Sequence, residues 1–192
     1  LERFGPEVIG ISFTSSHLPG IYWMSRELRR RFPKAIQVFG GVHPTMDAER
    51  CLEHADGVCV GEGDLAFVEF LADPRRRDVA NFWYRDNGGV VRNPMRPLVA
   101  DLDELPFPFY GDATNDLLIE HDRAIPFRSF AYPDLCDSLV ISSQRGCPFG
   151  CTYCLHGVMR DQYPGQKYLR RKSVDRFLDE VDLRAREFGL HA

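Results

Sequence analysis

The sequence has no apolar run that approaches the ~18 residues of a membrane span, so it predicts no membrane-spanning helix. It has no excess of positive charge either, because its 192 residues carry a formal net charge of -4. That charge argues against a general nucleic-acid binder. The sequence pattern predicts no signal peptide at the start, since Leu1-Glu2-Arg3 leads directly into a strand pattern. What remains is a globular protein, and 44% hydrophobic residues are enough to build its core.

The chain also lacks the cysteine density of a small secreted disulfide scaffold. Six cysteines are present, three of them scattered and three within eight residues: Cys51, Cys59 and Cys136, then Cys147, Cys151 and Cys154. A reducing cytoplasm is the expected location, and there a tight cysteine cluster indicates metal or redox chemistry. The first residue is leucine rather than methionine, which favours a piece of a longer chain.

Strand and helix patterns alternate over residues 1–80. Short apolar runs predict buried strands over 8–13, 35–39 and 57–60, and amphipathic segments predict helices over 20–32, 47–55 and 64–72. This alternation predicts an α/β fold, a partial doubly wound parallel sheet with helices on its faces. Ligands of such sheets bind beyond the carboxyl ends of the strands.

The residues that follow these predicted strands are small or polar, which makes them candidates for ligand binding. Ser12 and Thr14 can hydrogen-bond a buried ligand, and the glycines let the backbone approach a flat or phosphate-bearing ligand. Each position also has a simpler explanation as turn chemistry, with Glu62 as a helix N-cap partner and His43 as a turn residue. The candidates are Ser12, Thr14, Gly40, Gly41, His43, Gly61, Glu62 and Gly63.

The pattern changes after residue 80. Residues 81–93 hold two β-rich runs around Asn87-Gly88-Gly89, which indicates a hairpin. Residues 94–135 are rich in proline, aromatic and acidic residues and predict a linker over the surface. The hairpin and linker are therefore grouped as one segment over 81–135, after a domain over 1–80.

The last segment, 136–192, is predicted to form a strand, a loop and a helix. Residues 138–143 form the apolar run of the strand. The helix is expected over 173–188, with Ser173 as its N-cap and Asp175 in its first turn.

Cys147, Cys151 and Cys154 form a C-x3-C-x2-C motif in the loop between them. Three thiolates from one loop can enclose one metal site, and thiolates suit iron–sulfur clusters or zinc. With only three protein ligands, a cubane cluster keeps one iron open for a small molecule, which favours a catalytic site. The alternatives are a structural zinc site that adds His156 as fourth ligand, a redox pair, or three unliganded thiols.

The motif and its surroundings, Arg145 to Phe149 and Cys151 to Cys154, resemble the radical S-adenosylmethionine superfamily. The resemblance implies that the three cysteines hold a 4Fe-4S cluster, and that S-adenosylmethionine binds the open iron with Tyr153 near its adenine. It implies reductive cleavage to a 5′-deoxyadenosyl radical, with the electron supplied by a donor such as flavodoxin or ferredoxin. Residues 136–192 would be the first strand, loop and helix of the family's partial TIM barrel, so this piece alone is expected to be inactive.

The N-terminal elements resemble a subgroup of these enzymes that carries a cobalamin-binding, flavodoxin-like domain in front. The resemblance rests on the order and spacing of four segments: Val8 to Thr14, Phe39 to Thr45, Val60 to Asp64 and Leu102 to Pro108. It implies that the strand-end candidates line the pocket for the nucleotide tail of cobalamin. It extends to anaerobic magnesium-protoporphyrin monomethyl ester cyclases, and so implies methyl transfer or cyclisation of a small-molecule substrate.

Two departures from that subgroup bear on its cofactor and its assembly. None of the six histidines has an aspartate two residues before it, so the D-x-H-x-x-G motif that can ligate cobalt is absent. The subgroup's leading strand and helix are not in this sequence, and a sheet edge exposed in this way favours self-association. The alternative function is a non-catalytic α/β binding module with a structural zinc or iron–sulfur site.

Overall fold

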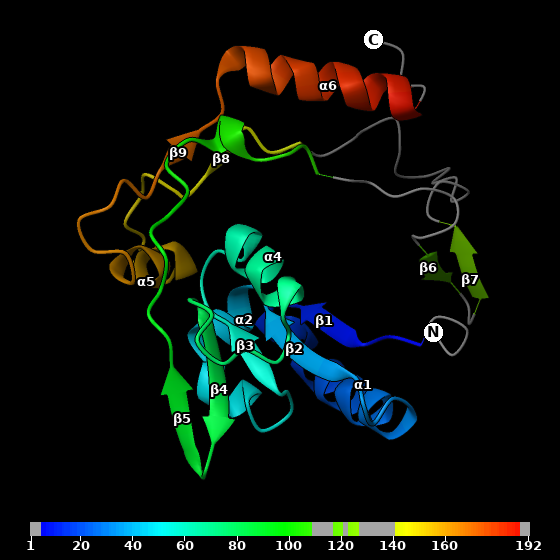
Figure 1. The fold of residues 1–192 in the computed structure, drawn as a ribbon. Helices are drawn as coiled ribbons and strands as arrows, with labels where there is room; N and C mark the ends of the chain where they lie inside the picture. Colours follow the sequence, from blue (N-terminus) through cyan, green and yellow to red (C-terminus); the bar gives the residue numbers. More distant parts are fainter. Residues whose placement is uncertain (1–4, 109–116, 121–122, 127–140, 189–192) are drawn as a thin grey trace. The chain divides into compact units, whose positions relative to one another are not determined.

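A computed structural model describes residues 5–108, 117–120, 123–126 and 141–188 (Figure 1). The chain divides into two compact units, Leu1–Leu98 and Val99–Ala192. Within the described residues, no helix combines the length and the apolar character that a membrane crossing requires.

The first unit is built on one five-stranded mixed sheet. Its strands are β1 (Val8–Ser12), β2 (Ile36–Gly40), β3 (Gly57–Cys59), β4 (Phe82–Asp86) and β5 (Gly89–Arg92). They lie in the order β1-β2-β3-β4-β5. β1, β2 and β3 are parallel to one another, whereas β4 pairs antiparallel with both β3 and β5. The three strands predicted in the first 60 residues are confirmed, and their carboxyl ends meet at one edge of the sheet.

Helices connect the parallel strands and cover both faces of the sheet (Figure 1). The short 3-10 turn η1 (Ser15–His17) and helix α1 (Leu18–Arg31) lead from β1 to β2; α2 (Val42–Met46) and α3 (Ala48–Cys51) lead from β2 to β3; α4 (Asp64–Ala72) follows β3. The predictions of helices over 20–32 and 64–72 are confirmed. The helix predicted over 47–55 is present but shorter, because α3 covers Ala48–Cys51 and residues 52–54 form a turn. The chain leaves helical geometry at Asp47, with φ -138° and ψ 54°, which separates α3 from α2.

Alternate residues of the strands enter two separate cores. Phe39 of β2 and Val58 of β3 pack with residues of α1 and α3, whereas Val38 and Cys59 pack with residues of α4. This is the two-residue period of a strand that is buried on both faces. The expected α/β architecture, a largely parallel sheet between helices, is thereby confirmed for the first unit.

The hairpin formed by β4 and β5 belongs to this sheet. Although the sequence pattern groups residues 81–93 with the linker, β4 pairs with β3, and Cys59 lies opposite Phe82. Phe82 is buried and stacks on Phe70 of α4, with 4.6 Å between ring centroids. β3 needs a partner on its free edge, and the hairpin supplies it while burying its own aromatic face.

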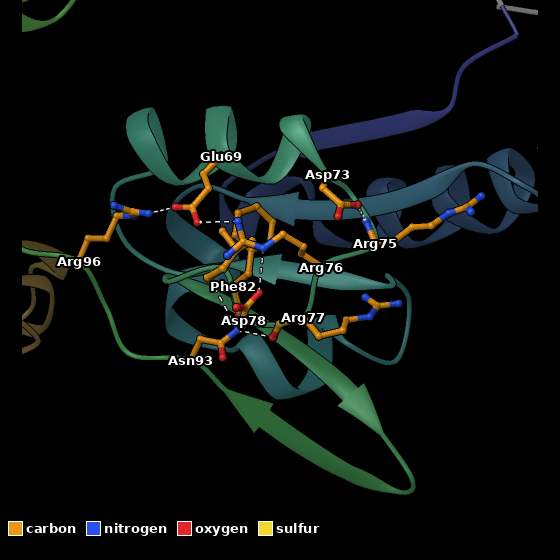
Figure 2. Close-up of polar contacts among 10 residues, drawn as sticks. Glu69, Asp73, Arg75, Arg76, Arg77, Asp78, Phe82, Asn93 and Arg96 are labelled. Atoms are coloured by element: carbon orange, nitrogen blue, oxygen red, sulfur yellow. Dashed lines mark hydrogen bonds and ion pairs between the residues drawn. The ribbon is translucent and has the colours of Figure 1, made fainter.

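The loop between α4 and β4 is held in place by the polar contacts drawn in Figure 2. The Glu69 carboxylate of α4 forms ion pairs with Arg76, at 3.2 Å, and with Arg96. The Asn93 side-chain amide donates to three backbone carbonyls of the loop and strand, those of Arg77, Val79 and Phe82. These contacts fix the reversal that allows β4 to run antiparallel to β3.

The second unit contains short strands and two helices. The elements are the 3-10 turn η2 (Leu102–Glu104), β6 (Leu117–Glu120), β7 (Arg123–Pro126), β8 (Gln144–Arg145), α5 (Leu155–Asp161), β9 (Arg170–Arg171) and α6 (Val174–Phe188). β6 pairs with β7 and β8 pairs with β9, both antiparallel.

Of the two elements predicted for residues 136–192, one is confirmed. The helix expected over 173–188 is present, and Ser173 caps it by accepting a hydrogen bond from the Arg176 backbone N–H at 3.1 Å. The strand expected over 138–143 lies partly outside the described residues, and residues 141–143 are not in a strand. The short β8 follows instead, and its antiparallel partner β9 is not the parallel pairing of a barrel.

The segment from Val99 to Pro108 runs along α6. The Asp103 carboxylate accepts a hydrogen bond from the Ser173 backbone N–H at 2.9 Å. The pKa of Asp103 is lowered by hydrogen bonding to the Ser173 side chain and, to a smaller extent, to this backbone N–H. Arg176 donates to the Leu105 carbonyl at 2.6 Å and lies 3.5 Å from the centroid of the Phe107 ring. This part of the expected linker is therefore fastened to the start of α6 by polar and cation–π contacts.

We predict that Phe70→Ala lowers the free energy of unfolding of the first unit by about 3 to 5 kcal/mol, because Phe70 is fully buried and its removal leaves a cavity. Both tryptophans, Trp23 and Trp83, lie in this unit, so tryptophan fluorescence during denaturant titration measures its unfolding. Val68→Ala on the same helix is the control, since Val68 is exposed and its loss should change the value by less than about 0.5 kcal/mol. Equal losses from both variants would contradict the assigned core.

Candidate functional site

A cavity of about 500 Å³ lies where the carboxyl ends of β1, β2 and β3 meet α4. The structure brings five of the predicted residues to its wall: Ser12, Gly40, Gly41, Gly61 and Gly63. Residues that the sequence patterns did not single out complete the wall, among them Gly10, Cys59, Asp64 and Phe67. Both the strand-end glycines and α4 are therefore part of one site.

Gly41 sets the shape of the cavity at the end of β2. Its φ is +90°, and a Cβ at this position would lie 2.6 Å from Ser12 Oγ and 3.1 Å from the Phe13 backbone nitrogen. Only glycine combines that φ with so close an approach. The two strand ends can therefore come together with backbone, rather than side chains, facing the cavity.

Thr45 joins the loops that follow β2 and β3. Its buried hydroxyl donates to the Gly41 carbonyl at 2.8 Å and accepts from the Gly61 backbone N–H at 3.0 Å. One hydroxyl thus satisfies two backbone groups and fixes the distance between the two glycine loops. Sequence reasoning marked the segment that contains Thr45 but not this role, because the partner loop lies sixteen residues away.

Three predicted residues of this half do not line the cavity. The Thr14 hydroxyl lies 3.0 Å from His17 Nδ1 in a local contact. His43 is buried, its Nδ1 lies 2.9 Å from Ser15 Oγ, and its ring lies 5.6 Å from the Phe13 ring. Glu62 is half-buried between the two lining glycines. The side chains of Thr14 and His43 thus make contacts with the 3-10 turn or its neighbours.

Cys59 gives the cavity a neutral wall. Burial, together with a smaller effect of the nearby Asp64 carboxylate, raises the pKa of its thiol to about 12. A thiol with this pKa stays protonated at neutral pH, so Cys59 acts as a small apolar group there. Cys59 shares the cavity wall with Phe67 and with the strand-end glycines.

The cysteine loop lies in the second unit. Cys147 and Cys154 are half-buried and Cys151 is exposed. The Cys154 backbone N–H donates to the Cys151 carbonyl at 3.0 Å, which forms a turn between these two residues. Across the described residues, no three histidine, cysteine or acidic side chains gather closely enough to hold a metal. Cys136 lies outside the described residues.

The other two residues considered at this loop have different surroundings. The Tyr153 side chain is 92% exposed, so it makes little contact with its own unit. His156 Nδ1 lies 2.9 Å from the Tyr168 hydroxyl. The nitrogen that pairs with Tyr168 is thereby engaged in a protein contact, and only Nε2 is left for any other role.

Comparison with known proteins identifies the first part of the chain. Residues 1–71 match the family described as the B12 binding domain. This first part of the chain is similar to B12 binding domains. The predicted resemblance to a cobalamin-binding-domain family is confirmed, and the cavity lies within the matched segment, since all of its wall residues precede residue 71.

Full-length relatives include methyltransferases and a cyclase. The chain is 29% identical over 201 residues to an uncharacterized methyltransferase of Pyrococcus horikoshii, covering 99% of this chain and 39% of that protein. It is 25% identical over 204 residues to the anaerobic magnesium-protoporphyrin IX monomethyl ester cyclase of Cereibacter sphaeroides, covering 99% and 30%. It is 24% identical over 186 residues to the hopanoid C-3 methylase of Methylococcus capsulatus, covering 94% and 33%. The chain thus spans well under half the length of each.

We predict that Cys59 resists iodoacetamide at pH 8 in the folded protein, whereas Cys151 is alkylated. The thiolate is the reactive form, and a thiol with a pKa of about 12 becomes reactive only as the pH approaches that value. Peptide mass spectrometry after timed labelling measures both residues. Labelling in denaturant is the control, because unfolding removes the burial and should expose Cys59 to the reagent. Equal labelling of both cysteines in the folded state would contradict the burial of Cys59.

Proposed function

We propose that this chain is part of a cobalamin-dependent radical S-adenosylmethionine enzyme that carries out methyl transfer or cyclisation. The observation that carries the proposal is the presence, in one chain, of a glycine-lined cavity in a B12 binding domain and a C-x3-C-x2-C motif. The similarity to methyltransferases and a cyclase over nearly the whole chain supports this class of reaction. The electron for such chemistry would come from a flavodoxin- or ferredoxin-type donor.

The cavity fits part of a large cofactor. Its volume of about 500 Å³ lies within the usual range of small-molecule sites, ~300–1,000 Å³. Its place at the carboxyl ends of parallel strands is where α/β sheets bind nucleotides. Gly40 and Gly41 present bare backbone, while Val38 and Phe67 present apolar surface to a flat ring. We assign these residues to the nucleotide tail of cobalamin.

The donor set of the second unit fits a cluster. Cys147, Cys151 and Cys154 supply three soft thiolates from one loop, which is the ligand number that leaves one iron of a cubane open. When bound, the cluster would supply the electron that cleaves S-adenosylmethionine, and the exposed Tyr153 would lie close to that cofactor. The turn from Cys151 to Cys154 already brings the backbones of two of these residues together.

We predict that the chain, reconstituted anaerobically with iron and sulfide, binds about four irons and that Cys151→Ala loses this iron. The loss of one of three thiolate ligands opens a second iron and destabilises the cluster. Iron analysis and visible absorbance measure the result. Cys59→Ala is the control, because Cys59 lies in the first unit and its removal should leave the iron content unchanged. Stoichiometric zinc without iron, or full iron content in Cys151→Ala, would overturn the assignment.

We predict that Gly40→Val weakens hydroxocobalamin binding at least roughly tenfold, measured by absorbance titration. A Cβ at Gly40 would lie 3.8 Å from Cys59 Cβ, an ordinary contact, so the fold should tolerate it while the valine methyl groups enter the cavity. Gly89→Val, the same substitution on a strand outside the cavity, is the matched control. Equal affinity for hydroxocobalamin in the two variants would place the ligand elsewhere.

A further inference from the structure

The return segment after α5, residues 167–172, lies against both ends of the cysteine loop. β9 pairs with β8, so Arg170 lies opposite Arg145, which comes two residues before Cys147. The Lys172 backbone N–H donates to the Ser143 carbonyl at 3.0 Å and extends this pairing. The start of the loop is therefore fixed to a segment that comes about twenty-five residues later in the chain.

Tyr168 contacts the first end of the loop through its backbone. Gly146, which directly precedes Cys147, has a φ of +85°, and a Cβ there would lie 2.2 Å from the Tyr168 carbonyl oxygen. Only glycine allows the backbones to come this close. The direction in which the chain enters the cysteine loop is thus set by its contact with Tyr168.

Tyr168 contacts the other end of the loop through its side chain. Its hydroxyl lies 2.9 Å from Nδ1 of His156, which comes two residues after Cys154, and the two rings meet edge to face with 5.9 Å between centroids. The loop from Gly146 to His156 therefore begins and ends against a single residue.

The return segment is itself anchored to the rest of its unit. Lys172 pairs with Glu180 of α6, and Glu180 is buried. Arg170 is buried and donates to the Val99 carbonyl at 2.8 Å. Because a paired, buried charge is costly to separate, these contacts hold the return segment against α6 and against the segment from Val99 to Pro108. Tyr168 therefore lies in an anchored segment, and both ends of the cysteine loop contact it.

We propose that Tyr168 is a positioning residue that clamps both ends of the cysteine loop, with Nδ1 of His156 as its partner at the second end. The inference rests on the proposed cluster site. Holding the ends of a loop lowers the conformational entropy lost when its three thiolates converge on one cluster. It also gives His156 a role in positioning the loop through Nδ1.

The test is a double-mutant cycle on the reconstituted 192-residue chain, with Tyr168→Phe, His156→Ala and the double variant. Each single variant should release iron to a chelator roughly fivefold faster than wild type, the value of one ordinary hydrogen bond. The double variant should lose no more than the larger single effect, because both changes remove the same contact. His156→Asn, which keeps a polar atom near the position of Nδ1, should restore much of the wild-type rate.

Tyr84→Phe is the matched control, because the Tyr84 hydroxyl is buried in the first unit with no partner among the described residues. It should leave iron release unchanged. Loss of all metal in His156→Ala in both backgrounds would make His156 a ligand and overturn the inference. So would additive effects of the two substitutions, or iron release from Tyr168→Phe at the wild-type rate.

Amide hydrogen exchange of the metal-free chain separates this inference from the proposed function. Tyr168→Phe should raise exchange within residues 146–157 and leave α6 unchanged, whether or not a cluster can be built. If wild type takes up no iron but this local change appears, the cluster assignment fails and the clamp stands. If wild type takes up iron and exchange in 146–157 is unaffected, the clamp fails and the cluster assignment stands.

Discussion

Burial of β2 on both faces is the constraint on which the first unit depends. Val38 and Phe39 enter different cores, so a shift of one residue in register would exchange the two sides of the sheet. Gln37, also fully buried, fixes the register with polar contacts: its side chain accepts from Ser25 Oγ at 2.8 Å, and its backbone N–H donates to Asp56 at 2.8 Å. With β2 fixed, Gly40 and Gly41 must fall at the sheet edge, and the cavity forms where the neighbouring strands end beside them.

Sequence patterns predicted those elements whose stability is local or repeats along the chain. The apolar runs of β1, β2 and β3 and the helical patterns of α1, α4 and α6 correspond to observed elements. The short helix α2 was missed because Pro44 reads as a turn signal, although proline is tolerated in the first turn of a helix. β9 and the addition of β4 to the sheet depend on partners far along the chain, which no local pattern reveals.

The same distinction applies to the cavity. Its glycines were predictable because a strand end that approaches a ligand or a neighbouring strand requires them, whatever the partner. The direction of a side chain just beyond a strand was not predictable. Thr14 and His43 follow strand ends just as Ser12 and Gly41 do, yet the backbone turns after β1 and β2 carry their side chains to Ser15, His17 and Phe13. Thr45, two residues further on than His43, bridges the loops instead.

Each of the two units has a glycine of positive φ next to its candidate site. Gly41 and Gly146 both have positive φ, and at both a side chain would overlap a neighbouring segment, Ser12 in one case and the backbone of Tyr168 in the other. In each, the close approach joins parts of the chain that are distant in sequence: the ends of β1 and β2 at Gly41, and the start of the cysteine loop and the return segment at Gly146. The fold and the site are therefore coupled through backbone geometry, and a substitution of Gly41 or Gly146 disturbs the fold and the site together. By contrast, Gly40→Val and Tyr168→Phe can change a site while the fold that supports it remains.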